Sequence, residues 1–164
     1  MFQEKWQGRV TIEDDIAFFE RVPTLSALGR AALRILAIGA EIRFVHAGEV
    51  LFYAGDAADS AYAIQEGSFG LLPHRAEGEA DEVIARRGAL LDELAMITPT
   101  KRLATATALE PTTVIRISRG LFLKMLEAYP DTARNLRDAM AARSDQWTRE
   151  MENVRVNLET RSGK

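Results

Sequence analysis

The sequence predicts a mixed α+β fold. An antiparallel β-barrel or jelly roll (double-stranded β-helix) is expected between short N-terminal helices and a long C-terminal helix. Apolar residues keep helical spacing over residues 11–39 and again over residues 118–158. Between these regions, short apolar runs alternate with glycine turns. Strands this short, separated by turns, favour antiparallel pairing over βαβ units.

Two short helices are expected before the first strand. Thr11 and Asp14 are spaced as a capping box, with Asp in place of the usual Glu, and the helix they open must end near Pro23. Thr24 or Ser26 is a suitable cap for a second helix, whose apolar positions keep helical spacing as far as residue 39.

The middle of the chain is predicted to form short strands. Its apolar and β-branched runs are bounded by Gly, Asp and Pro turns, and the charged stretch 73–81 is expected at the tip of a hairpin. The expected strands are residues 42–45, 50–53, 60–64, 68–72, 82–85, 103–108 and 113–117.

The last part of the chain is predicted to be helical. Ser118 is placed to cap a helix that ends at Tyr129–Pro130, and Asp131 to cap a longer helix after it. A long helix with one narrow apolar stripe needs a partner, so we expect homodimerisation. The seam, with one stutter, comprises Ala133, Leu136, Met140, Ser144, Trp147, Met151, Val154 and Leu158; the expected dimerisation residues are Met140, Trp147, Met151, Val154 and Leu158.

These patterns predict three regions: an arm over residues 1–10, a β-barrel with flanking helices over 11–130, and the dimerisation helix over 131–164.

The absence of cysteine excludes disulfides and thiolate metal sites, and the two histidines lack an acidic cluster at ligand spacing, so no metal is expected. A formal net charge of −3 gives no reason to expect nucleic acid as a partner. Without a leader or an apolar span, a cytoplasmic location is the default.

The stretch from residue 88 to residue 108 contains the charged groups best suited to binding. Gly88 makes a turn, the acidic pair Asp92 and Glu93 opens one turn of helix, and Arg102 follows a Pro-containing break. The unpaired N–H groups of such a turn, with a guanidinium folded back over them, are able to cradle a phosphate. Glu93 is able to accept hydrogen bonds from a sugar hydroxyl.

This layout resembles the phosphate-binding cassette of the cyclic nucleotide-binding domain family, of which the sensor domain of catabolite activator protein is a member. The residues on the family pattern are Gly88, Leu91, Glu93, Ala95, Met96, Ile97, Arg102, Ala104, Thr105 and Ala108. Turns at residues 47–51 and 55–62 extend the resemblance to about residues 16–126.

The resemblance implies a ligand and a set of contacts. The ligand would be cAMP or cGMP, with Arg102 pairing with the cyclic phosphate and Glu93 accepting the ribose 2′-hydroxyl. Backbone N–H groups of the cassette helix would complete the anion site. The candidate nucleotide-binding residues are Leu91, Asp92, Glu93, Leu94, Ala95, Arg102 and Leu103.

Two positions depart from the family pattern. Leu103 replaces a Ser or Thr and removes a hydrogen bond worth about 1 kcal/mol. Asp92 replaces a glycine and places a second negative charge beside the phosphate; at about 4 Å and an effective dielectric near 20, the repulsion is about 4 kcal/mol. In the self-capped hypothesis, Asp92 instead accepts from the N–H of Leu94 or Ala95 and pairs with Arg102, so that the protein supplies its own anion.

The expected function is a non-catalytic sensor, in which cyclic nucleotide binding moves the terminal helices and alters a dimer or an effector protein. No nucleophile with an adjacent base is evident, so an enzyme is not expected. No helix-turn-helix follows the long helix in this sequence, so DNA is not expected as a partner. The alternative is a degenerate domain that binds no nucleotide and serves as a dimeric structural or interaction module. A third hypothesis is that the same pocket binds another small anion.

Overall fold

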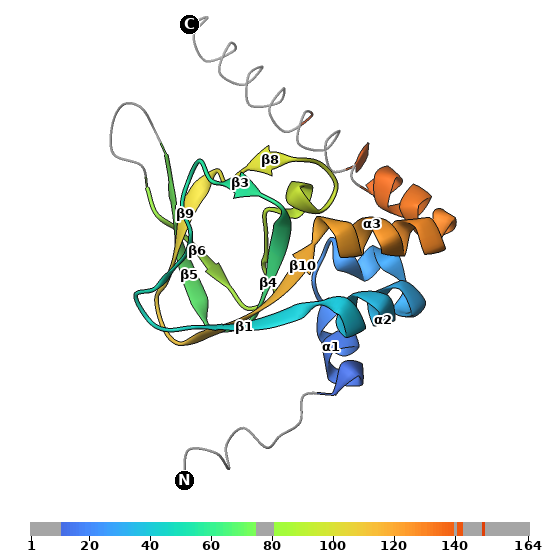
Figure 1. The fold of residues 1–164 in the computed structure, drawn as a ribbon, viewed down its shortest axis with the longest axis horizontal. Coiled ribbons are helices and arrows are strands. Elements are labelled where there is room, and N and C mark those ends of the chain that lie inside the picture. Colours follow the sequence, from blue (N-terminus) through green and yellow to red (C-terminus); the bar gives the residue numbers. More distant parts are fainter. Residues whose placement is uncertain (1–10, 75–80, 140, 143–148, 150–164) are drawn as a thin grey trace, which may run out of the picture.

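The helices of this computed structural model lie together on one side of a β-sandwich (Figure 1). The structure describes residues 11–74, 81–139, 141–142 and 149. The helical elements are α1 (Ile12–Phe19), the 3₁₀ helix η2 (Leu25–Leu28), α2 (Arg30–Gly39), the 3₁₀ helix η3 (Glu93–Met96) and α3 (Arg119–Ala128).

The strands lie between α2 and α3 in the sequence. They are β1 (Glu41–Val45), β2 (Val50–Phe52), β3 (Ala57–Ala58), β4 (Ser60–Glu66), β5 (Ser68–Pro73), β6 (Val83–Arg86), β7 (Leu90–Leu91), β8 (Thr100–Lys101), β9 (Ala104–Ala108) and β10 (Thr112–Ser118). Each expected strand is present within a few residues of its predicted bounds. The strands β3, β7 and β8 were not predicted, since two residues are too few to show an alternating pattern.

The described strands form two four-stranded antiparallel sheets, with the orders β1-β10-β4-β7 and β2-β9-β5-β6. A separate two-stranded ribbon joins β3 to β8. The expected mixed α+β jelly-roll class is confirmed. Of the two forms expected, barrel or jelly roll, the described residues form the jelly roll, because their hydrogen-bonded ladders make separate sheets and not one continuous ring.

Strand β4 is buried on both faces because it lies between the helices and the second sheet. Ala61 and Ala63 pack with the helices, and Tyr62 and Ile64 pack between the two sheets. Alternate residues of a strand point to opposite faces, so one strand supplies both apolar cores. Strand β4 is therefore packed between the two cores.

The first helices differ partly from their prediction. The capping box of α1 is confirmed, with Asp14 N donating to Thr11 Oγ1 at 3.2 Å and Thr11 N donating to Asp14 Oδ2 at 2.9 Å. The single second helix is wrong, because Gly29 (φ 81°) separates η2 from α2. Thr24 makes no side-chain cap, and Ser26 Oγ instead donates to a backbone carbonyl three residues earlier.

The region after the last strand begins as expected. Ser118 Oγ caps α3 by accepting from Leu121 N at 3.2 Å. The next helix covers residues 130–139 of the described chain, so Asp131 lies inside it and is not its cap. Proline fits the first position of a helix, where no N–H partner is needed. Leu136 is 3% exposed and joins the helical core.

The dimerisation residues Met140, Trp147, Met151, Val154 and Leu158 lie outside the described residues. The arm over residues 1–10 does too. The expected homodimer therefore stays a prediction from the sequence.

Candidate anion site in the cassette

Asp92 is held in a backbone conformation that favours glycine. Its φ and ψ are 58° and 51°, and it is the one non-glycine residue of the described chain with positive φ. The left-handed region costs most residues about 1–2 kcal/mol, but aspartate tolerates it. The family's glycine and this chain's aspartate therefore fit the same turn, which joins β7 to η3.

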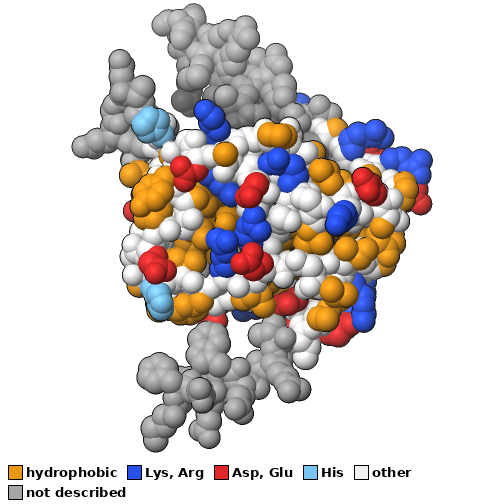
Figure 2. Space-filling view, in the orientation of Figure 1, with side chains coloured by type: hydrophobic (Ala, Val, Ile, Leu, Met, Phe, Trp, Pro, Cys, Tyr) orange, Lys and Arg blue, Asp and Glu red, His pale blue; other side chains and the backbone are white. Residues whose placement is uncertain are grey.

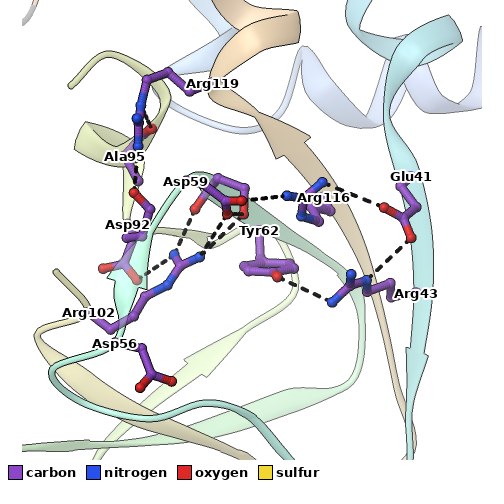
Figure 3. Close-up of polar contacts among 12 residues, drawn as sticks. Glu41, Arg43, Asp56, Asp59, Tyr62, Asp92, Ala95, Arg102, Arg116 and Arg119 are labelled. Carbon is purple, nitrogen blue, oxygen red and sulfur yellow. Dashed lines mark hydrogen bonds and ion pairs between the residues drawn. The ribbon is translucent and has the colours of Figure 1, made fainter. Parts of the chain in front are cut away.

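The Arg102 side chain is almost completely buried, with 4% of it exposed. Its Nη1 donates to Asp92 Oδ2 at 3.0 Å and to the backbone oxygen of Ser60 at 2.7 Å. Its Nη2 donates to Ser60 Oγ at 3.3 Å (Figure 3). Asp59 Oδ1 lies 4.0 Å from Nη2. The guanidinium that the resemblance assigns to a cyclic phosphate is thus bonded within the protein.

Aromatic rings complete the surroundings of this guanidinium. The Cζ of Arg102 lies 4.5 Å from the centre of the Phe52 ring and 5.3 Å from that of Tyr62. The two rings stack on each other with centres 5.9 Å apart and belong to the core between the sheets. A cation over aromatic faces in a desolvated site gains about 2 kcal/mol. Arg102 is therefore part of the sandwich interior as well as of the cassette.

The self-capped hypothesis is correct in one part and wrong in the other. The expected contact between Asp92 and Arg102 is present. The expected cap is absent, because the Asp92 side chain accepts from no N–H of η3. The backbone oxygen of Asp92 accepts from Ala95 N at 3.0 Å instead, which leaves the carboxylate for Arg102.

Glu93, the residue assigned to the ribose, also has a partner within the protein. One of its carboxylate oxygens, Oε2, accepts from the hydroxyl of Thr24 in the turn between α1 and η2. Thr24 is buried, with 8% exposed. Sequence reasoning missed Thr24 as a site residue, because its partner lies 69 residues away and no local pattern connects them.

A pocket of about 600 Å³ opens beside the cassette. Four of the candidate nucleotide-binding residues, Asp92, Glu93, Leu94 and Leu103, line it, and Leu103 is 78% exposed. Leu91, Ala95 and Arg102 are buried and are not among its lining residues. The remaining lining residues are Pro23, Thr24, Gly88, Ala89, Leu90, Thr100 and Lys101.

A chain of ion pairs extends from Arg102 across the first sheet (Figure 3). Asp59 pairs with Arg116 at 3.1 Å, and Arg116 lies 3.6 Å from Glu41. Arg43 lies 3.5 Å from Glu41. The hydrogen bond from the neighbouring Ser60 hydroxyl is the largest cause that lowers the pKa of Asp59; partial burial opposes it, and Arg116 acts in the same direction as the hydroxyl.

Charges of both signs therefore alternate on this face. Figure 2 shows basic and acidic side chains mixed across the middle of the molecule, with apolar side chains on either side. The sequence alone did not predict this network. Its charges come from two strands, β1 and β10, and from the short segments just before β4 and β9, which meet only through the sheet order. Such a balanced set presents no strongly positive surface to an anion.

Within the described residues, no three His, Asp or Glu side chains are grouped closely enough to hold a metal ion. Across the same residues, none of the helices has the length and apolar content needed to span a membrane.

The fold and the cassette together define a family. Residues 42–129 match the cyclic nucleotide-binding domain, and the chain belongs to that family.

Particular relatives refine this assignment. A cyclic nucleotide-binding-like protein of Brucella abortus is 40% identical, with a TM-score of 0.62 over 70% of this chain and 98% of that one. The N-terminal domain of a Streptomyces coelicolor transcriptional regulator is 26% identical, with a TM-score of 0.74 over 82% of this chain and 94% of that one. An uncharacterised NTE family protein of Mycobacterium tuberculosis is 36% identical over 109 residues, or 66% of this chain. The chain spans between 7% and 18% of the length of such curated relatives.

Proposed function

We propose that this chain is a regulatory domain whose anion site is occupied by its own Asp92 carboxylate, so that it works without micromolar binding of cAMP or cGMP. The single observation that carries the proposal is the 3.0 Å contact between Arg102 Nη1 and Asp92 Oδ2. Arg102 is buried, and a buried guanidinium requires an anion or an equivalent set of acceptors. Asp92 meets that requirement from within the chain.

An incoming phosphate would have to displace this carboxylate. Asp92 lies in the turn that shapes the site, so it would stay close to the phosphate after leaving Arg102. Repulsion of about 4 kcal/mol corresponds to about a thousandfold loss of affinity. Phe52 and Tyr62 stack against the same guanidinium and further restrict its movement toward the pocket.

A second candidate is the cyclic nucleotide sensor, in which the ligand phosphate replaces Asp92 and the ribose replaces Thr24 as partner of Glu93. The observation in its favour is that Glu93 lines a pocket of about 600 Å³ in a cassette that keeps Arg102 at the family position. A drug-sized ligand fits pockets of about 300–1,000 Å³.

Calorimetric titration with cAMP and cGMP separates the two candidates. We expect no heat of binding for the wild type up to millimolar nucleotide, and micromolar binding for Asp92→Gly, which frees Arg102 and keeps the left-handed turn. Asp92→Asn is the matched control, because it removes the charge but keeps the bulk. Micromolar binding to the wild type that is lost in Arg102→Lys would establish the sensor instead.

We propose that the domain acts by forming a homodimer or by binding an effector protein. The seam from residue 140 to residue 158 predicts a homodimer through the C-terminal helix, and we propose that an effector protein binds the helices that pack against the first sheet. We propose a non-catalytic role in the cytoplasm, with no direct DNA contact by this domain.

A further inference from the structure

Arg119, the first residue of α3, contacts two separate segments beside the anion site. Its Nη2 donates to the backbone oxygen of Ala58 in β3 at 2.6 Å, and its Nε donates to the backbone oxygen of Ala95 in η3 at 3.1 Å. Its backbone N–H donates to the oxygen of Asp59 at 2.8 Å. Arg119, Ala95, Asp92 and Arg102 follow one another along one side of Figure 3.

Each of these segments also contacts one member of the buried ion pair. On the η3 side, Ala95, whose carbonyl oxygen accepts from Arg119, donates its own N–H to the Asp92 backbone oxygen at 3.0 Å. On the β3 side, Ala58 and Asp59 lead directly into Ser60, whose backbone oxygen and hydroxyl accept from Arg102. The contacts of Arg119 therefore lead along two paths to the same pair.

Burial makes these contacts hard to replace. Ala58 is 2% exposed and Ala95 is 0% exposed, so water is not at hand to substitute for the guanidinium at their carbonyl oxygens. A guanidinium also presents its N–H groups in a fixed planar fork. It satisfies both carbonyl oxygens only while the two segments keep their present separation.

We infer that Arg119 is a positioning residue that couples the state of the Asp92–Arg102 pair to the start of α3. When the pair opens, η3 and the segment from β3 to β4 are free to separate, and Arg119 must release one carbonyl. The first turns of α3 then lose an anchor, whichever anion has taken the place of Asp92. The inference rests on the proposed function in one respect, that Asp92 is the resident anion.

Amide hydrogen exchange of α3, measured without ligand, tests this coupling. The set comprises the wild type, Asp92→Asn, Arg119→Gln and the double variant. Each single variant is expected to raise exchange in the first turns of α3 by about tenfold, a change of about 1.4 kcal/mol. The double variant should exchange no faster than the faster single variant. Lys124→Gln, an exposed substitution on the same helix, is the control and should have little effect.

Independent, multiplicative effects in the double variant would overturn the coupling, and so would an Asp92→Asn variant that leaves α3 protected. If Arg119→Gln does not fold, Arg119→Lys keeps the charge without the fork; in that background, adding Asp92→Asn should leave α3 exchange unchanged. Micromolar cAMP binding to the wild type would contradict the proposed function without affecting this ligand-free comparison.

Discussion

At the scale of single residues, Asp92 decides how the cassette works. The family pattern has glycine at this position, whereas this chain has Asp92 with left-handed backbone. The Asp92 carboxylate pairs with Arg102, the arginine that the family pattern assigns to phosphate. The pair is mostly buried, with 18% of the Asp92 side chain and 4% of the Arg102 side chain exposed. Removing one member of such a pair leaves an uncompensated charge.

Asp92→Asn should therefore destabilise the domain. We expect a loss of about 2–3 kcal/mol in the free energy of unfolding, somewhat below the usual range for a buried pair because Ser60 still accepts from Arg102. Asp56→Asn is the matched control, since Asp56 is exposed and its bond to Tyr53 N is one that asparagine can also accept. Urea denaturation measures both. Equal losses for the two variants would contradict a special role for Asp92.

Asp15 predicts a pH dependence of the opposite sign to most carboxylates. Burial is the largest cause that raises the pKa of Asp15, while the hydrogen bond from Gln65 Nε2 at 3.0 Å opposes it. A raised pKa in the folded state means that the folded chain holds this proton more tightly than the unfolded chain does. This contribution to stability is therefore fully present below the ordinary value of 3.8 and is lost as pH rises through the folded pKa.

Asp15→Asn removes that ionisation. The difference in unfolding free energy, variant minus wild type, should increase as pH rises from about 3.5 toward 7 and then level off. Denaturation at a series of pH values measures this difference directly. A constant difference, or a variant that is less stable at pH 7, would show that Asp15 is not penalised by burial.

At the scale of elements, local patterns were sufficient where the signal lies within a few residues. The capping box at Thr11 and the cap at Ser118 were predicted, and so were the longer strands. The split at Gly29 was not, because the apolar spacing continues across the glycine. The two-residue strands are set by partners elsewhere in the sheets, so their own sequence carries little information.

The cap of α1 offers a quantitative test at this scale. Thr11→Ala removes the acceptor for Asp14 N and the donor to the Asp14 carboxylate. We expect a loss of about 1 kcal/mol, as is usual for a threonine N-cap. Thr98→Ala, at an exposed threonine outside any helix, should change the unfolding free energy by less than about 0.5 kcal/mol. Thermal unfolding followed by circular dichroism distinguishes the two.

At the scale of the whole molecule, the family could be predicted from the ordered turns and the cassette. Most of the hydrogen-bond partners within the site could not. The contact between Asp92 and Arg102 followed from the departure at a single position. Ser60 lies 42 residues from Arg102, and Thr24 lies 69 residues from Glu93. These partners meet only because the jelly roll and the N-terminal helices fold around the cassette.

Homodimerisation through the C-terminal helix is the prediction at this scale. Replacing Trp147 and Met151 together by alanine should convert a dimer to a monomer, because these positions lie on the apolar seam. Sedimentation velocity measures the change, with Arg149→Ala, which lies off the seam, as the control. A dimer that survives the double substitution would place the interface elsewhere.

Nitrogen NMR of the Arg102 guanidinium in solution tests directly whether the Asp92 carboxylate occupies the anion site. For the wild type, we predict separate, slowly exchanging Nη–H signals that do not move on addition of cAMP, because Asp92 and Ser60 hold the group in place. In Asp92→Gly, the signals should exchange faster and shift when cAMP is added. Averaged, fast-exchanging signals in the wild type, or a shift with micromolar cAMP, would contradict occupation of the site by Asp92.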